Sequence, residues 1–354
     1  MDLAFIWAGL IAFAVLAYVI LDGFDLGLGL LFPFLGSNEE RDVAMNSVAP
    51  VWDGNETWLV LGGGGLFAVF PLAYAIVMPA LYAPIIAMVL GLVFRGVAFE
   101  FRWRTTRARW VWDVSFFGGS LIATLAQGIA LGALVQGIEM DLVAREYSGG
   151  NWDWLTPFSL LTGAALVVGY ALLGATWLVM KAEGDLNARA RRYAMPLLLG
   201  TLALIGAVSL WTPFLSDVYF TRWLAFVVQQ PVSEVEGAEL ADVFAWWTVI
   251  TVLVMPVLVA GAAFMLWRGL RTGHDTWPFV SALAIFVLCF VGIGISFYPM
   301  MVPPDLTIWM AAAPDDSLWF LLVGAMVLVP LILAYTGYAY WVFRGKVRAG
   351  EGYH

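Results

Sequence analysis

Charged residues are scarce in this sequence. They make up 12% of its 354 residues, whereas hydrophobic residues make up 62%, and the mean hydropathy is +0.88. A soluble globular domain is usually about 25% charged and about 45–50% apolar. The composition therefore excludes a soluble enzyme and a disordered chain, and it predicts a polytopic membrane protein. With 17 Lys and Arg against 26 Asp and Glu, the chain also lacks the basic face that nucleic-acid binding requires.

Cysteine and histidine are nearly absent as well. The single cysteine, Cys289, excludes a disulfide within the chain. Both histidines, His274 and His354, fall outside the apolar segments, whereas membrane proteins that bind haem usually ligate it through buried His, or through His and Met. No His, Cys, Asp and Glu cluster with the spacing of metal ligands is visible either. We therefore predict that this chain ligates neither haem nor metal.

Long apolar segments are present instead. A helix that spans a membrane needs about 20 mostly apolar residues, and the chain offers nine such segments: 4–31, 54–78, 80–99, 114–138, 157–181, 193–215, 243–269, 276–302 and 317–343. The weakest boundary lies at Met78-Pro79, where the proline predicts a tight turn between two segments. The sequence thus predicts an all-α membrane protein with nine transmembrane helices, forming a single membrane domain over residues 1–354.

The basic residues orient these segments, because Lys and Arg concentrate in cytoplasmic loops. If the N-terminus lies outside, the loops that face the cytoplasm are 32–53, 100–113, 182–192, 270–275 and 344–354. With their flanking residues these loops carry fourteen of the 17 Lys and Arg, and the opposite loops carry only Arg145 and Arg222. We therefore predict a periplasmic N-terminus and a cytoplasmic C-terminus.

Several acidic residues stand in or beside the first three segments, toward their predicted cytoplasmic ends. The acids are Asp22, Asp25, Asp53, Glu56 and Glu100, and the single base among them is Arg95. A charge at the bilayer centre costs at least about 2.5–3.5 kcal/mol on insertion scales, and one Arg can pair with only one or two carboxylates. The other acids must be protonated, wetted by a water-filled path or satisfied by another protein. The pattern predicts a surface that handles protons or faces a partner.

Some of these acids have a purely structural alternative. Asp53 and Glu56 are spaced as in a capping box, which places acids favourably at a helix N-terminus. Asp113, at the start of the fourth segment, is likewise predicted to be an N-cap. Asp22 and Asp25 lie at the C-terminal end of their segment, where the helix dipole disfavours acids, so capping does not account for them.

Three motifs link these residues to a known family. LDGFDLGLG, NSVAPVWDGNETWLVLGGG and FRGVAFEFR follow one another between residues 18 and 104. In this order and spacing they closely resemble subunit II of cytochrome bd-type quinol oxidases, and the wording APVWDGNETW with RGVAFEFR is more similar to the cyanide-insensitive branch. The resemblance implies two four-helix bundles, at 1–138 and 157–302, and a peripheral ninth helix at 317–343. It also implies a multi-pass protein of the bacterial cytoplasmic membrane.

The resemblance further implies an activity that the chain performs only within a complex. Such a complex oxidises quinol and reduces dioxygen to water with protons taken from the cytoplasm. Haems b and d, or b alone, lie in the partner, subunit I, and a small single-helix accessory subunit often accompanies the pair. The quinol is ubiquinol or menaquinol, and whether subunit II also binds a structural quinone or lipid stays open.

Individual residues acquire roles from the same resemblance. Asp53 and Glu100 match acids that line a proton path from the cytoplasm toward the oxygen-reducing haem, and Asp25 matches an acid that is structural or conducts protons. Asp22 joins this set because of its position. Trp58 matches an aromatic residue near a route for dioxygen, with core packing as its alternative. Trp52, Asn55 and Arg95 are likewise predicted to face the haem-bearing partner or to border the route for dioxygen.

Two other classes of protein stay open on the residues alone. A proton-coupled secondary transporter would also bury acids and one Arg, although no pair of interrupted helices stands at matching places in two halves of the chain. A purely structural membrane anchor would use the acids only to bind a catalytic partner.

Overall fold

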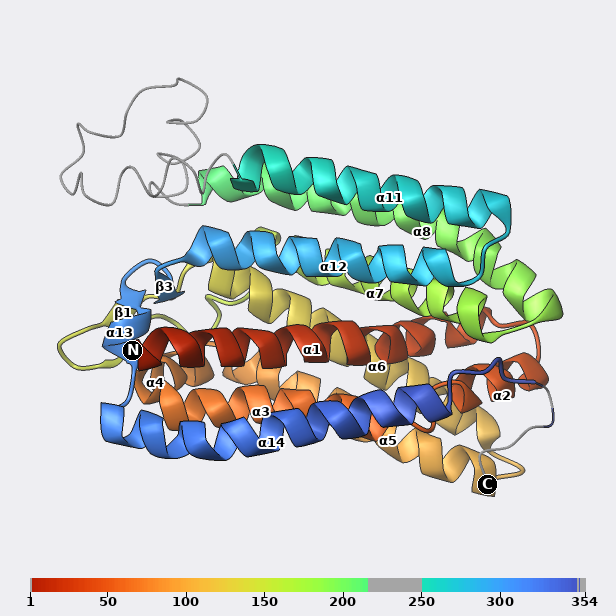
Figure 1. Ribbon diagram of the computed structural model, residues 1–354, viewed down its shortest axis with the longest axis horizontal. Coiled ribbons are helices and arrows are strands. Elements are labelled where there is room, and N and C mark those ends of the chain that lie inside the picture. The colour runs from red at the N-terminus through yellow and green to blue at the C-terminus, as the bar shows by residue number, and fades with distance from the viewer. Residues whose placement is uncertain (1, 216–249, 349, 351–354) are drawn as a thin grey trace.

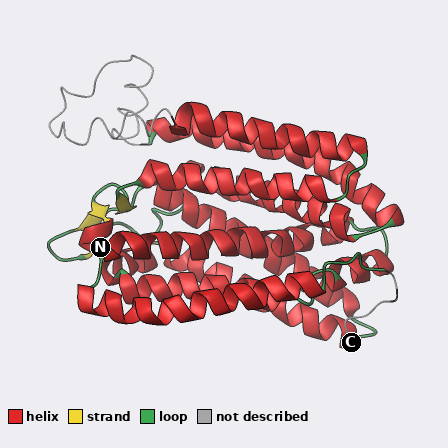
Figure 2. Cartoon of the chain, viewed as in Figure 1, coloured by secondary structure: helices red, strands yellow, loops and turns green. Residues whose placement is uncertain are grey.

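The computed structural model describes residues 2–215, 250–348 and 350. The first residues of the predicted segment 243–269, and Arg222, therefore lie outside the described residues. Helices dominate the described part of the chain (Figure 2). The long helices are α1 (Leu3–Leu31), α3 (Trp52–Val69), α4 (Pro71–Ala80), α5 (Tyr82–Arg104), α6 (Arg109–Gln136), α7 (Pro157–Lys181), α8 (Gly184–Trp211), α11 (Met255–Thr272), α12 (Thr276–Phe297) and α14 (Asp315–Val342).

Short elements connect the long helices. The helical ones are η1 (Phe32–Phe34), α2 (Asn38–Asn46), η2 (Thr212–Phe214), a π-helical turn at Ile250–Val254 and α13 (Ile308–Ala311). The strands are β1 (Met140–Asp141), β2 (Glu146–Tyr147), β3 (Met300–Val302) and β4 (Leu306–Thr307). They form two antiparallel pairs, with Met140 opposite Tyr147 and Met300 opposite Thr307.

Eight helices of the described ranges are long and apolar enough to cross a membrane. The predicted segment 54–78 is absent from this set, because it is not one helix. It divides at Phe70, whose φ of −126° and ψ of 62° are not helical, into α3 and α4. The break predicted around Met78-Pro79 falls at Leu81, two residues later, and Pro79 itself lies inside α4. A full count of nine transmembrane helices stays a prediction.

Several helices extend beyond their apolar segments. The helix predicted at 193–215 begins at Gly184, and the helix predicted at 114–138 begins at Arg109. Each added stretch carries Arg residues, so hydropathy alone places the helix start too late. The segment 276–302 errs in the other direction, because α12 ends at Phe297 and β3 follows.

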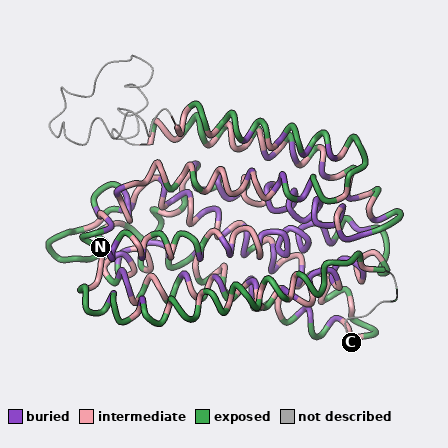
Figure 3. The backbone as a smooth tube through the Cα atoms, viewed as in Figure 1, coloured by how far each residue is buried: buried purple, intermediate pink, exposed green. Residues whose placement is uncertain are grey.

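Close helix contacts depend on glycine in the centre of the molecule. A Cβ on Gly27 of α1 would overlap the carbonyl oxygen of Tyr170 on α7, and a Cβ on Gly174 would lie 2.3 Å from the carbonyl carbon of Gly27. Small residues of this kind let membrane helices approach backbone to backbone. Buried positions are accordingly concentrated along α1 and α7, whereas α11 and α14 are largely exposed (Figure 3). The division into two four-helix bundles and a peripheral helix remains a prediction.

The connecting loops gather at the two ends of the helices, and α1 begins at the end opposite to the one where α14 finishes (Figure 1). At one end, ion pairs join loops that the sequence places on the same side. These pairs are Arg41–Asp113, Arg189–Glu40, Arg191–Asp275 and Lys346–Asp275. At the other end, Ile138 donates its N–H to the carbonyl of Pro303 at 3.0 Å, and the Trp309 indole donates to Asp2 at 2.8 Å. Which end faces the cytoplasm stays a prediction.

Candidate functional site

A buried cluster of charged side chains forms where α1, α3 and α5 meet. Asp22 on α1 and Arg95 on α5 are both fully buried. Arg95 Nη1 donates to Asp22 Oδ1 at 2.6 Å, and its Nη2 donates to Glu56 on α3. One guanidinium therefore bridges two carboxylates, a pairing that its planar fork of donors favours.

Asp25 belongs to the same cluster, but Arg95 does not reach it. It lies one turn after Asp22 on α1 and is also fully buried. Its Oδ2 accepts a hydrogen bond from Asn55 Nδ2 at 2.7 Å, and Asn55 Oδ1 accepts one from the hydroxyl of Tyr340 on α14 at 2.9 Å. The other oxygen of Asp25, and Asp22 Oδ2, have no hydrogen-bond partner within the described part of the chain. The cluster thus holds more carboxylate oxygens than the described donors satisfy.

Local sequence explains how these side chains come together. Asp22 and Asp25 are three residues apart, so they share one face of α1. Arg95 reaches that face because α5 packs closely on α6, where a Cβ on Gly91 would lie 2.7 Å from the carbonyl oxygen of Gly119. Gly91 and Gly119 therefore set the distance between α5 and α6 beside the motif that contains Arg95.

The capping explanation for the second motif does not hold. The N-cap of α3 is Val51, without a side-chain capping bond, and Glu56 pairs with Arg95 instead. Asp113 is not an N-cap either, because α6 begins after Ala108.

Asp113 instead belongs to a second ion-pair group, which ties α2, α5 and α6 together. It accepts from the fully buried Arg102 at 2.6 Å and from Arg41 at 3.0 Å. Arg102 Nη1 also donates to Asp42 at 2.6 Å.

Asp53 and Glu100 lie outside the buried cluster. Both are exposed, and Glu100 faces Arg104 across 3.6 Å on its own helix. The preceding residues, Trp52 on α3 and Phe99 on α5, stack with ring centroids 4.7 Å apart and planes 7° from parallel. This stack joins α3 to α5 directly beside the two exposed acids.

Trp58 is buried with an exposed fraction of 1%. Its ring packs edge-on against Phe13 at 5.6 Å. Its indole nitrogen has no hydrogen-bond partner among the residues described. These contacts are those of a core residue that borders α1.

Four polar residues that the sequence analysis missed extend the cluster. Tyr340 has been described above. Tyr18 lies one turn before Asp22 on α1, and its hydroxyl accepts from Gln127 Nε2 at 2.8 Å. Gln127 Oε1 accepts in turn from the Tyr170 hydroxyl at 3.1 Å. The spacing of Tyr18 and Asp22 was a usable signal, since residues four apart share a helix face. No local pattern indicates Tyr340, which is 285 positions from Asn55.

Within the described ranges, no group of three or more His, Cys, Asp and Glu could hold a metal ion. The cluster itself holds carboxylates, two amides, phenols and one guanidinium. Such groups donate and accept hydrogen bonds, and the carboxylates also take up and release protons.

These observations define an all-α, multi-pass membrane protein with a charged cluster buried among its helices. Within that class, the family model described as cytochrome bd terminal oxidase subunit II matches residues 3–343, and the chain belongs to this family. It is thus a subunit of a bacterial respiratory oxidase.

Individual relatives agree with this assignment along the whole chain. The chain is 33% identical over 367 residues to the cytochrome bd-I ubiquinol oxidase subunit 2 of Escherichia coli K12, covering 98% of this chain and 95% of the relative. It is 30% identical to the cytochrome bd ubiquinol oxidase subunit 2 of Bacillus subtilis 168, covering 98% and 97%. A chain in the structure of the bd oxidase from Geobacillus thermodenitrificans shares the fold, with a TM-score of 0.73, 18% identity and coverage of 97% and 99%. Membership of the cyanide-insensitive branch stays a prediction.

Proposed function

We propose that this chain is the haem-free subunit that supports a haem-bearing subunit I and supplies part of its cytoplasmic proton-uptake path. The observation that carries the proposal is the pairing within the buried cluster. Arg95 binds Asp22 and Glu56, while the fully buried Asp25 accepts a hydrogen bond from the amide of Asn55 and has no ion pair among the described residues. Burying Asp22 and Asp25, with the partly buried Glu56 beside them, against one guanidinium is costly if all three carboxylates are ionised. A cluster of this composition is suited to accept and release a proton.

The exposed acids supply the entrance in this proposal. Asp53 precedes Glu56 by one turn of α3, and Glu100 follows Arg95 by five residues, about 7.5 Å along the axis of α5. A proton taken up at Asp53 or Glu100 would thus be within one or two helical turns of the cluster. In this proposal, the end of the molecule where most basic residues lie faces the cytoplasm, and the N-terminus faces the periplasm.

Trp52, Asn55 and Trp58 have further roles in the proposal. Trp52 and Asn55 hold α3 against its neighbours beside the exposed acids, through the ring of Phe99 and the hydroxyl of Tyr340. Trp58, buried against Phe13, borders the apolar route by which dioxygen reaches the partner.

The composition of the complex follows from the relatives and from the residues that this chain lacks. The Escherichia coli and Bacillus subtilis relatives are named ubiquinol oxidase subunits, and we carry over ubiquinol or menaquinol as the reductant and dioxygen as the acceptor. Haems b and d, or b alone, lie in subunit I, since this chain places no histidine in its apolar helices. A small single-helix subunit completes the complex, and a quinone or lipid bound to this chain has a structural role.

The test is quinol oxidase turnover of complexes that carry Asp53→Asn or Glu100→Gln. We expect turnover to fall severalfold while haem content and subunit I stay as in the unsubstituted complex. Normal turnover in both variants would refute a proton path through these acids. Loss of haem or of subunit I would favour the alternative, a structural anchor whose acids only bind the partner.

A further inference from the structure

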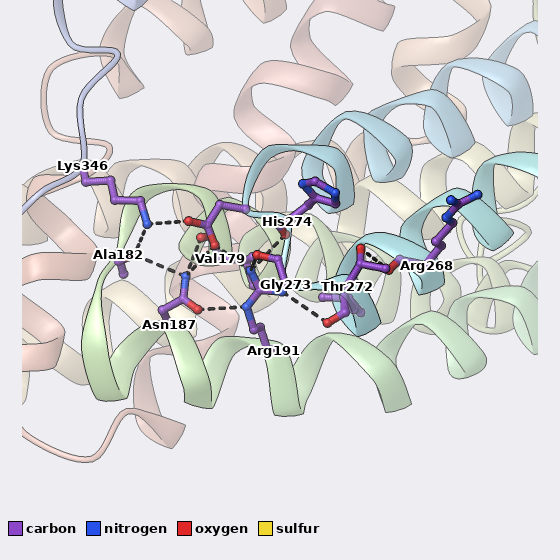
Figure 4. A network of polar contacts seen from close by, with 11 residues as sticks. Val179, Ala182, Asn187, Arg191, Arg268, Thr272, Gly273, His274 and Lys346 are labelled. Atoms are coloured by element: carbon purple, nitrogen blue, oxygen red, sulfur yellow. Dashed lines mark hydrogen bonds and ion pairs between the residues drawn. The ribbon is translucent and has the colours of Figure 1, made fainter.

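A pocket of about 270 Å³ lies in the hairpin between α11 and α12, at the end of the molecule that carries most basic residues. Its lining residues are Met265, Arg268, Gly269, Thr272, His274 and Trp277. Figure 4 shows the polar network beside it, with Arg268 at its right-hand end and His274 above its centre. None of these residues belongs to the buried cluster on α1, α3 and α5.

The main chain that carries His274 is held firmly in place. Arg191 on α8 donates to the carbonyl oxygens of Gly273 and His274, at 3.2 and 2.9 Å, and to Asp275 Oδ1 at 2.6 Å (Figure 4). Gly273 ends α11 in the left-handed conformation, with a φ of +78°. Arg191 therefore holds the hairpin through its backbone carbonyl groups. The His274 imidazole takes no part in these contacts.

The polar groups of the pocket are available for a ligand. Within the described part of the chain, neither the Arg268 guanidinium nor the His274 imidazole takes part in an ion pair. The nearby carboxylate of Asp275 is already engaged, by Arg191 and by Lys346 at 2.6 Å each. Arg268, His274 and the Trp277 indole thus offer N–H donors beside an acid whose charge is balanced.

Apolar side chains continue from the pocket along both helices. Phe264 and Met265 on α11 are exposed, and so are Trp277 and Val280 on α12. Tryptophan is enriched where a membrane helix meets the lipid headgroups. The pocket therefore combines a cationic end with an apolar face that runs toward the membrane interior.

We propose that this pocket binds the phosphate headgroup of an anionic phospholipid, with Arg268, His274 and Trp277 as donors and the acyl chains along α11 and α12. Basic pockets between membrane helices bind phospholipid headgroups through this combination of charge and depth. The volume is slightly below the ~300–1,000 Å³ typical of pockets for drug-sized ligands, which suits a headgroup whose chains stay in the bilayer. Arg268 supplies a charge-assisted hydrogen bond to the phosphate oxygens.

The test is native mass spectrometry of the intact oxidase complex, released from nanodiscs that contain phosphatidylcholine and phosphatidylglycerol. We expect the unsubstituted complex to retain bound phosphatidylglycerol, and Arg268→Gln to weaken this retention about tenfold, as the loss of one charge-assisted hydrogen bond implies. His274→Gln should weaken it as well. Arg271→Gln is the matched control, because Arg271 lies over the ring of Trp267, 5.9 Å from its centroid, and does not line the pocket.

Three results would overturn the proposal. Equal retention in Arg268→Gln and the unsubstituted complex would exclude the pocket as the binding site. An equal loss in Arg271→Gln would show that the lipid responds only to surface charge. Displacement of phosphatidylglycerol by an equal concentration of inorganic phosphate would identify a free-phosphate site. Haem content is measured in each variant, so that lipid retention is compared between complexes that are equally well assembled.

Discussion

Arg95 on α5 donates to Asp22 on α1 at 2.6 Å, and both side chains of this ion pair are fully buried. A second carboxylate, Glu56 on α3, binds the same guanidinium. Removing one partner of a buried pair leaves an uncompensated charge, which is far more costly than never having had the pair. Arg95 therefore holds three helices together as well as balancing the charge of the cluster.

We predict that Arg95→Met destabilises the complex by about 3–5 kcal/mol, because it leaves Asp22 and Glu56 unpaired in the interior. The measurement is thermal unfolding of the purified complex in mild detergent. Arg104→Met is the control, since Arg104 is exposed and pairs only weakly with Glu100 at 3.6 Å. Matching melting curves for the two variants would contradict a central role for Arg95.

A second prediction concerns Asp25, which has one hydrogen bond to Asn55 and no ion pair with Arg95. Asp25→Asn keeps the shape of the side chain and removes its ability to carry a proton. We expect oxygen consumption at saturating quinol to fall about a hundredfold, which is the lower end of what a positioned proton-transfer group contributes. Haem content should be unchanged.

The matched control for Asp25 is Asp316→Asn. Asp316 is exposed in the first turn of α14, at the other end of the molecule, and its substitution should leave turnover unaffected. If Asp25→Asn turned over as fast as Asp316→Asn, Asp25 would be a structural residue only.

The sequence predicted the helices well where apolar residues are continuous, and less well where they are not. The break at Phe70 interrupts an apolar run, so hydropathy does not show it, although Pro71 disfavours a helical conformation at the residue before it and occupies the first turn of α4. The early start of α8 was missed for the opposite reason, since its first turns contain charged residues. Hydropathy indicates which residues lie within the membrane, whereas the residues at which a helix begins and ends depend on backbone geometry.

The sequence likewise predicted some contacts of the buried cluster and missed others. The motifs placed Asp22, Asp25, Glu56 and Arg95 near one another, and the structure joins Arg95 to two of them. It separates Asp53 and Glu100, which are exposed, from this cluster. The contact of Tyr340 with Asn55 depends on how α14 packs against α3, and a single sequence does not contain that information.

A third prediction tests the close approach of α1 and α7. In Gly27→Ala the new Cβ would overlap the carbonyl oxygen of Tyr170, which is backbone and cannot rotate away. Overpacking of this kind typically costs about 1–3 kcal/mol, so the melting temperature of the complex should fall. Gly9→Ala on the same helix is the control, because a Cβ there meets nothing within 4 Å. A decrease of the same size in Gly9→Ala would mean that α1 resists any added side chain, and that the contact with Tyr170 is not special.

The last prediction concerns the segment after α14, which an ion pair between Lys346 and Asp275 fastens to the hairpin between α11 and α12. Burial alone would raise the pKa of Asp275, but hydrogen bonds from Lys346, Arg191 and Asn187 outweigh it and lower the pKa below its ordinary value. Lys346 in turn donates to the carbonyl of Ala182 at 3.3 Å. An acid whose folded-state pKa is lowered contributes stability that is present above its unfolded pKa, about 3.9, and is lost as the pH falls through the folded value.

This attachment should therefore be intact at neutral pH and weaken below about pH 4. The amide of Val347, which donates to the carbonyl of Lys181 at 2.9 Å, reports the attachment through its hydrogen exchange. At neutral pH, Asp275→Asn should exchange this amide faster than the unsubstituted chain does, because the ion pairs with Lys346 and Arg191 are lost. As the pH falls below about 4 and through the lowered pKa of Asp275, the two proteins should become similar, since protonation removes the same charge. A constant difference between them across this pH range would show that the carboxylate charge does not hold the segment.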